Sequence, residues 1–379
     1  MTSIKKPIYK KIVLDTVLHL KKDFNLEVID THLHPFDVMG VVPFSEYEHI
    51  EDRNLLRIKN ENRNYDAEKI LNPNILERFD YGSILLSIAK MYSVFFPDSF
   101  SKDIISLYGF TGNKRLFDEM DMSLVDKSVF LPVEPWSMTD DVANCFDIKN
   151  NFILGSFDIH NTSIEDIYEK VDYYVKKYNI IGIKLHPNLQ DFYPQPSHNI
   201  STISDKLKLI YSLCDEYNLY LLFHCGISYF SNSYNSLYDK NYGRSKNKAL
   251  LSNFIDSDGN SEIFGKYKMP IILAHLANYG SNRLQYFSID KLVKLHDSIF
   301  FDTAGVSTSL LRDMLNVVSS KRVIFGSDAF YNGMLTSIVN IYKAIYNNNY
   351  REDKQEMFSN ILGRNFSEQI LRRGRTKCL

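Results

Sequence analysis

The stretch VIDTHLHP at residues 28–35 decides the interpretation of the rest of the chain. Apolar residues lead into two histidines separated by one residue, and Pro35 ends the segment because proline cannot donate a hydrogen bond to a neighbouring strand. In a β-strand alternate side chains share a face, so His32 and His34 point the same way, about 6.5–7 Å apart along the backbone. Two imidazoles on one face can bind a divalent cation, although a polar pair at a strand end is the plainer interpretation.

Length and composition describe a globular protein. A chain of 379 residues is long enough for one large domain, with 44% hydrophobic and 24% charged residues. The net charge of -2 gives no electrostatic reason to expect a nucleic acid or an anionic membrane as partner. The four cysteines are scattered without CxxC spacing, and charges interrupt the N-terminal segment, so it is not a secretory signal. We therefore expect a cytoplasmic protein with reduced thiols.

Short apolar runs alternate with helix-like segments along most of the chain. Counting from the histidine pair, eight runs are typical of strands: residues 28–34, 128–133, 152–157, 180–187, 219–224, 269–275, 298–303 and 323–328. Such alternation predicts a parallel sheet, and eight units in series are what a closed (β/α)8 TIM barrel requires. The alternative is an open doubly wound sheet, which we disfavour because no GxGxxG fingerprint follows an early strand.

A single barrel domain is expected over residues 1–379, because no repeat or Pro/Gly-rich linker divides the chain. A helix is predicted over residues 8–24, before the first strand. Residues 36–110 form an insertion too long for a simple loop, so it must contain helices of its own. Because it follows the strand with the histidine pair, we expect a lid or pocket wall over the site; a decorative subdomain is the alternative.

Metal-competent or ionisable residues occur at the ends of five of the eight predicted strands. They are His32, His34, Lys184, His186, His224, His275 and Asp328. Each alone could be a buried side chain bonded to a backbone carbonyl or a helix cap. A barrel, however, brings all the carboxyl ends of its strands to one rim, so the set as a whole predicts an active site.

The strand-end motifs resemble the amidohydrolase superfamily of metal-dependent TIM-barrel hydrolases. They are IDTHLHP, GIKLHP, FHCG, ILAHLAN and VIFGSD, in chain order. The likeness spans about residues 26–368 and is strongest to the branch that includes nonoxidative decarboxylases of the aminocarboxymuconate-semialdehyde type. The motifs identify the superfamily and leave the substrate open.

The resemblance implies that His32, His34, His224 and Asp328 bind the cation, and that His275 contacts substrate or shuttles a proton. A mixed His/Asp set suits zinc, with manganese or iron as alternatives. The resemblance also gives Asp328 a catalytic role, because a carboxylate at the metal can accept a proton from water and pass it to the leaving group.

Lys184 has two interpretations. In binuclear members of the superfamily a lysine at this strand is carbamylated and bridges two metals, whereas in mononuclear members the position can contact substrate. We favour one metal, with Lys184 as a cation for a substrate carboxylate or carbonyl. His186 shares a face with Lys184 by the two-residue period and could be a ligand, a substrate contact or a support for another ligand.

The sequence therefore predicts a metal-dependent hydrolase that activates water to cleave a C–N or C–O bond, in an amide, lactone or similar small molecule. The alternatives are a nonoxidative decarboxylase of a small carboxylic acid, and an inactive barrel used for binding. A homodimer is the default expectation for the assembly.

Overall fold

The computed structural model describes residues 6–34, 113–135, 137–146, 148–226, 247–279, 285–329 and 332–372. The predicted insertion at residues 36–110 lies outside these ranges, so its role as a lid stays a prediction. The helix predicted over residues 8–24 is confirmed as α1 (Lys6–Phe24), which precedes the first strand.

Eight short strands occur within the described ranges, and each overlaps a run that the sequence predicted; the second begins one residue before its run, at Lys127. They are β1 (Ile29–Leu33), β2 (Lys127–Phe130), β3 (Phe152–Ile153), β4 (Gly182–Leu185), β5 (Tyr220–Phe223), β6 (Ile271–Leu273), β7 (Ile299–Asp302) and β8 (Val323–Ile324). These strands pair in parallel and in chain order, first β1-β2-β3 and then β4-β5-β6-β7-β8. Parallel strands in sequence order are the arrangement expected of consecutive β/α units.

Backbone hydrogen bonds join the two groups of strands at both edges. Beyond β3, the Gly155 N–H donates to the Gly182 carbonyl over 2.9 Å, and the Lys184 N–H donates to the Gly155 carbonyl over 2.8 Å. Beyond β8, the Asp328 N–H donates to the His32 carbonyl over 2.9 Å, next to a parallel bridge between Leu33 and Ala329. The strands therefore form one (β/α)8 barrel, as predicted.

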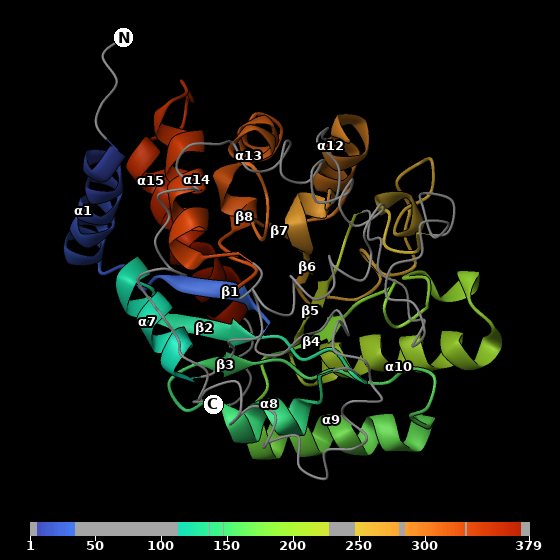
Figure 1. The fold of residues 1–379 in the computed structure, drawn as a ribbon. Coiled ribbons are helices and arrows are strands. Elements are labelled where there is room, and N and C mark those ends of the chain that lie inside the picture. The colour runs from blue at the N-terminus through green and yellow to red at the C-terminus, as the bar shows by residue number, and fades with distance from the viewer. Residues whose placement is uncertain are drawn as a thin grey trace, which may run out of the picture.

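Helices form the outer layer around the strands, as Figure 1 shows. Those described are α7 (Asn113–Ser123), α8 (Thr139–Cys145), α9 (Ile164–Tyr178), α10 (Ser201–Glu216), α12 (Tyr286–Leu295), α13 (Thr308–Leu315), α14 (Met334–Tyr346) and α15 (Lys354–Ser359), in addition to α1. Helix α9 illustrates why they pack: Ile167, Val171, Tyr174 and Tyr178 recur at helical spacing and are all buried. The Ser163 hydroxyl accepts the Asp166 N–H and fixes the start of that helix.

A second apolar cluster, separate from the larger core, lies inside the barrel. It comprises Ile29, Val129, Leu131, Leu154, Tyr220, Leu222, Ile272, Ala274, Phe300, Ile324, Phe366 and Ile370. Phe366 and Ile370 come from the turn η7 (Phe366–Leu371), and the Phe366 ring meets Tyr220 edge to face at 5.7 Å. Apolar side chains thus fill the interior of the barrel, below the polar residues at its rim.

An irregularity in β1 changes which side chains face inward. The pairing with β2 runs from Ile29 opposite Lys127 and Asp30 opposite Ser128 to Leu33 opposite Phe130, so β1 has one more residue than β2 over this stretch. Strict alternation would place His32 and His34 on the face opposite to Ile29. The extra residue restores them to the interior, as a β-bulge does when it re-aims a side chain.

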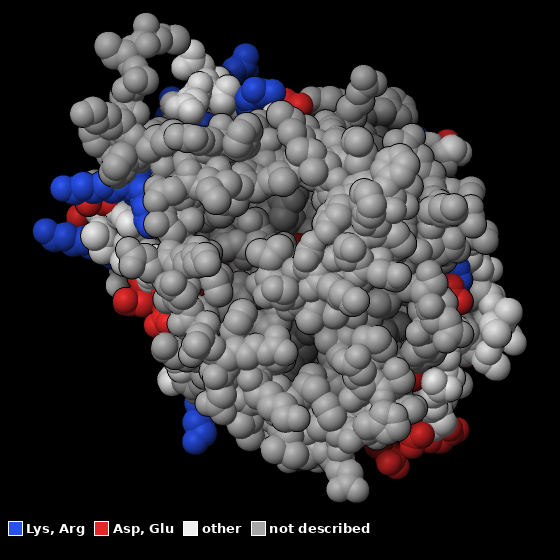
Figure 2. All heavy atoms as spheres, in the orientation of Figure 1, with Lys and Arg blue, Asp and Glu red and all other residues white. Residues whose placement is uncertain are grey.

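Charges of both signs lie at the edge of the face drawn in Figure 2, where described Lys, Arg, Asp and Glu side chains occur close together at the left. This mixture agrees with the net charge of -2 of the whole chain. Among the described residues, the helices are all too short or too polar to cross a membrane.

Candidate metal and substrate site

The carboxyl rim of the barrel collects the side chains that the sequence singled out. His32, His34, Lys184, His186, His224, His275 and Asp328 are all buried. Three of them, His32, His34 and Asp328, offer ligand atoms that lie within 4.8 Å of one another, as a metal site requires. The structure thus unites residues from β1 with one that follows β8, almost 300 positions later in the sequence.

Hydrogen bonds fix the tautomers of the two β1 histidines. His32 Nδ1 lies 2.7 Å from Asp302 Oδ2, and His34 Nδ1 lies 3.1 Å from the Leu131 carbonyl oxygen. Both partners are acceptors, so each Nδ1 carries the proton and donates it. Each neutral ring then has a lone pair on Nε2, and burial keeps the rings neutral by lowering the pKa of both well below its usual range.

The two Nε2 atoms are only 3.1 Å apart, so their lone pairs face each other. Asp328 Oδ1 lies 3.7 Å from Nε2 of His32 and 3.9 Å from Nε2 of His34. Ligands bound at about 2.0–2.2 Å in tetrahedral or octahedral geometry are separated by roughly 3.0–3.5 Å. Two facing lone pairs with a carboxylate beside them therefore suit a divalent cation, and the donor types are accepted by zinc, manganese and iron.

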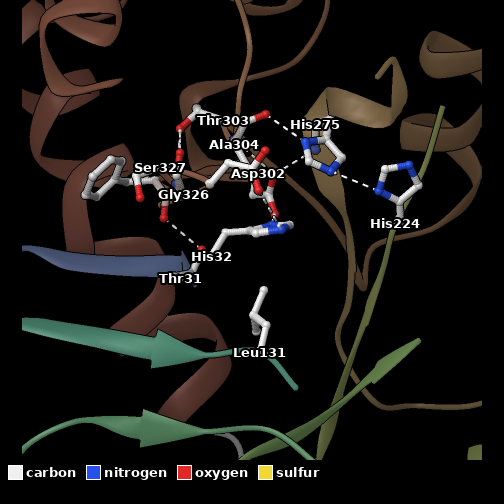
Figure 3. A network of polar contacts seen from close by, with 12 residues as sticks. Thr31, His32, Leu131, His224, His275, Asp302, Thr303, Ala304, Gly326 and Ser327 are labelled. Atoms are coloured by element: carbon white, nitrogen blue, oxygen red, sulfur yellow. Dashed lines mark hydrogen bonds and ion pairs between the residues drawn. The ribbon is translucent and has the colours of Figure 1, made fainter. Parts of the chain in front are cut away.

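His224 lies outside this group of three, among the other imidazoles. His275 Nδ1 donates to the Ala304 carbonyl over 2.8 Å, so His275 Nε2 is an acceptor; it lies 3.1 Å from His224 Nδ1 (Figure 3). His224 therefore carries its proton on Nδ1, which leaves a lone pair on Nε2. That buried nitrogen has no hydrogen-bond partner among the described residues. His224 thus keeps the tautomer of a metal ligand, and its place in the ligand set stays a prediction.

Lys184 places a cation inside the barrel. Its Nζ is buried without a hydrogen-bond partner in the described part of the chain. Burial lowers the pKa of Lys184 to about 8, although the carboxylates of Asp302 and Asp328 act in the opposite direction. The Lys184 charge in turn contributes to the lowered pKa values of the surrounding imidazoles, among them His34 and His224. A buried ammonium in this position is suited to an anionic group of a ligand.

His186 lies beside His224, with the two rings stacked at 4.0 Å between centroids. His186 Nδ1 accepts the N–H of Leu189 over 3.2 Å, and its own backbone N–H donates to Gln190 Oε1 over 2.7 Å. This nitrogen is therefore occupied by the loop after β4. These contacts suit a role for His186 in supporting the His224 ring better than a role as a metal ligand.

Two strand-end predictions need correction in detail. His275 was predicted as the last residue of a strand, but β6 ends at Leu273, and His275 begins a left-handed turn with φ values of 58°, 53° and 56° at residues 275–277. Asp328 lies four residues beyond β8, also with a positive φ of 65°. Left-handed backbone costs a non-glycine residue about 1–2 kcal/mol, so hydrogen bonds must hold these segments in place.

Two buried aspartates with a structural part in the site were missed by the sequence analysis. Asp302 ends β7 and contacts His32 and the backbone of His275. Asp30, in β1, accepts the hydroxyl and backbone N–H of Ser327 and so supports the segment that leads to Asp328. Burial raises the pKa of Asp30 to about 7. Asp302 could have been found, because it ends a predicted strand just as the other site residues do.

The fold and the site together define a (β/α)8 barrel with candidate metal ligands at its rim. A family model described as amidohydrolase matches residues 116–363, so the chain belongs to the amidohydrolase family. The resemblance drawn from the strand-end motifs is thereby confirmed. No curated protein matches the chain.

Solved structures with the same fold cover almost the whole chain. A 5-carboxyvanillate decarboxylase from Novosphingobium aromaticivorans, in complex with manganese and 4-hydroxy-3-methoxy-5-nitrobenzoic acid, is 12% identical with a TM-score of 0.52, covering 92% of this chain and 97% of that chain. The same enzyme from Sphingomonas paucimobilis is 16% identical with a TM-score of 0.51, covering 92% and 99%. An uncharacterized TIM-barrel protein from Bordetella bronchiseptica is 12% identical with a TM-score of 0.51, covering 92% and 99%. At these identities the likeness shows the fold.

Proposed function

We propose that this chain is a metal-dependent enzyme that removes the carboxylate of a small carboxylic acid as CO2. The observation that carries this proposal is the buried Nζ of Lys184, which has no hydrogen-bond partner among the described residues and lies within the group of imidazoles and carboxylates at the rim. A cation at the edge of a pocket anchors a remote part of the substrate. The Lys184 ammonium lies instead among the candidate metal ligands, where it would hold the substrate carboxylate at the reacting centre. This position favours decarboxylation over hydrolysis.

The residues at the rim can divide the work of such a reaction. His32, His34, His224 and Asp328 would hold the cation, which would supply a Lewis acid for the substrate oxygens. Lys184 would bind the carboxylate before it leaves. The C–C bond breaks, its electron pair stays on the substrate carbon, and a proton replaces CO2 there. Asp328 would provide that proton, because His275 already donates its only ring proton to the Ala304 carbonyl.

Two of the solved structures described above are named as 5-carboxyvanillate decarboxylases, and one of them was solved with manganese. These names support the same reaction class for this chain and make manganese a candidate beside zinc.

Hydrolysis is the second candidate, and it is the reaction that the sequence analysis put first. Asp328 favours it, because its Oδ1 lies within 4 Å of both β1 imidazoles, where a carboxylate could take the proton of an attacking water. The two reactions have different products. Decarboxylation releases CO2, whereas hydrolysis in H2¹⁸O places ¹⁸O in the product.

The experiment loads the purified protein with zinc or manganese and offers a panel of hydroxylated aromatic acids, lactones and amides. We expect CO2 release from one or more of the acids. Incorporation of ¹⁸O from water without CO2 would instead establish hydrolysis.

Lys184→Met tests the observation directly, with 4-hydroxy-3-methoxy-5-nitrobenzoic acid as a carboxylate probe for calorimetry. We expect probe binding to weaken at least about tenfold, since a charge-assisted hydrogen bond is lost. The melting temperature of the metal-free protein should rise, because an unpaired buried charge is removed. Lys294→Met, on the exposed face of α12 beside Asp290, is the control and should change neither. Unchanged probe binding in Lys184→Met would remove the basis of the carboxylate proposal.

A further inference from the structure

One carboxylate joins two parts of the site that come from different strands. Asp302 Oδ2 lies 2.7 Å from His32 Nδ1, while Asp302 Oδ1 accepts the backbone N–H of His275 over 2.7 Å and that of Ala304 over 3.1 Å. Asp302 is fully buried, and Figure 3 shows it between His32 and His275. Its two oxygens therefore serve a candidate metal ligand on one side and the left-handed turn on the other.

The first contact determines which nitrogen of His32 is free. The carboxylate can only accept, so His32 must present its proton at Nδ1 and its lone pair at Nε2. Nε2 is the atom that lies 3.1 Å from His34 Nε2 and 3.7 Å from Asp328 Oδ1. Without an acceptor at Nδ1, the proton could move to Nε2 and block this ligand position.

The second contact holds the turn that carries His275. Residues 275–277 are all left-handed, which is unfavourable for side chains other than glycine. The Asp302 Oδ1 contact fixes the first N–H of the turn, and the Ala304 carbonyl fixes the His275 ring through Nδ1. The loss of Asp302 would release both the turn and the ring that contacts His224.

We propose that Asp302 is a positioning residue, which sets the tautomer of His32 for metal binding and holds the His275 turn in register with it. The inference rests on the proposed metal site. It gives one residue, which would itself bind neither metal nor substrate, control over a ligand on β1 and over the turn after β6 that carries His275.

Asp302→Asn is the most informative variant, because it keeps the shape of the side chain but leaves only one acceptor oxygen. Its single oxygen is needed by the two backbone N–H groups, so the amide NH2 faces His32 Nδ1. Two donors cannot face each other, and His32 must then move its proton to Nε2. The matched control is Asp215→Asn, because Asp215 also accepts backbone N–H groups, those of Lys268 and Met269, but at the amino end of β6 away from the rim.

Two readouts are compared in the wild type and the two variants. Long-range ¹H–¹⁵N NMR of the metal-free proteins reports the His32 tautomer, with the signal assigned by its loss in His32→Gln. Titration with Zn²⁺ or Mn²⁺ against a competing chelator reports metal affinity. We expect an Nδ1–H tautomer in wild type and Asp215→Asn, an Nε2–H tautomer in Asp302→Asn, and metal affinity about 10–100-fold lower in Asp302→Asn alone.

An Asp302→Asn protein that keeps the Nδ1–H tautomer overturns the proposal, whatever its metal affinity. If that variant does not fold by circular dichroism, the wild-type spectrum decides: Nδ1–H supports the proposal and Nε2–H overturns it. A wild-type protein that binds neither metal defeats the proposed function, while the tautomer measurement still tests the role of Asp302.

Discussion

The rim of the barrel has two halves that are built in different ways. The half after β4 and β5 carries Lys184, His186 and His224, placed by plain two-residue alternation or directly after a strand. The half after β6, β7, β8 and β1 carries His275, Asp302, Asp328 and the two β1 histidines. Here a β-bulge and two left-handed segments place the side chains.

The difference in backbone goes with a difference in hydrogen bonding. In the second half the Nδ1 atoms of His32, His34 and His275 all donate to fixed acceptors. In the first half, Lys184 Nζ and His224 Nε2 have no partner among the described residues. Irregular backbone is costly and persists where surrounding contacts determine it, so we infer that one half is fixed for the metal and the other is open to receive a ligand.

The largest expected effect is a loss of activity on removing His224, because the proposed metal site takes ligands from both halves of the rim. His224→Ala should abolish activity, by at least about 1000-fold, because the cation that supplies several kcal/mol of catalysis would lose a ligand. The fold should stay largely intact, since the change removes one ring hydrogen bond, from His224 Nδ1 to His275 Nε2, and Nε2 has no partner among the described residues. Elemental analysis of metal per chain and an activity assay measure this.

His296→Ala is the control, because that histidine contacts the Gly259 carbonyl at the end of α12 and lies outside the site. Full activity and full metal content in His224→Ala would show that the metal belongs to one half alone.

The next effect is on the pH dependence of stability in the metal-free protein. Burial lowers the pKa of His32, His34, His186, His224 and His275, so the folded rings stay neutral while the unfolded chain takes up protons below about pH 6.5. Stability should therefore fall as the pH falls through 6.5. Burial raises the pKa of Asp30 and Asp328 to about 7, so these two act in the opposite direction between about pH 4 and 7. Burial also raises the pKa of Asp302, which acts in the same direction as they do.

The five imidazoles outnumber the three carboxylates, so we expect a net loss of roughly 2 kcal/mol per pH unit between pH 6.5 and 5. Urea unfolding at several pH values measures it. Stability that rises on acidification would mean that the carboxylates dominate. Saturating zinc should steepen the loss, because protons compete with the metal for the imidazoles.

The smallest expected effect comes from two glycine substitutions. Both strain the backbone, but only one places a new methyl group against a site residue. Gly305 has a φ of 60°, and an added Cβ would lie 3.1 Å from Asp328 Oδ2. Gly265 has a φ of 77°, and its Cβ would meet only the His296 ring, at 3.4 Å or more. Both changes to Ala should cost about 1 kcal/mol of stability through left-handed strain. Only Gly305→Ala should also weaken metal binding, by a few fold, as thermal unfolding and metal titration together would show.

Much of the architecture could be predicted from local patterns. The eight strands overlap the predicted runs, because short apolar segments between amphipathic helices are typical of β/α units. The site residues were found because the carboxyl ends of barrel strands share one rim. Asp302 was not predicted because its part in the site is to accept the Nδ1 proton of His32, a contact between β7 and β1 that exists only in the folded barrel.

The sequence by itself determined the barrel, the identity of the rim residues and the chemistry they offer, since these depend on residue type and on spacing along the chain. Only the tertiary structure decided which of them face one another. The bulge in β1 reverses the alternation counted from Ile29, and the left-handed turn at residues 275–277 brings His275 to His224 and Asp302. Both departures from regular geometry are held by hydrogen bonds to distant strands, and such contacts exist only once the barrel has closed.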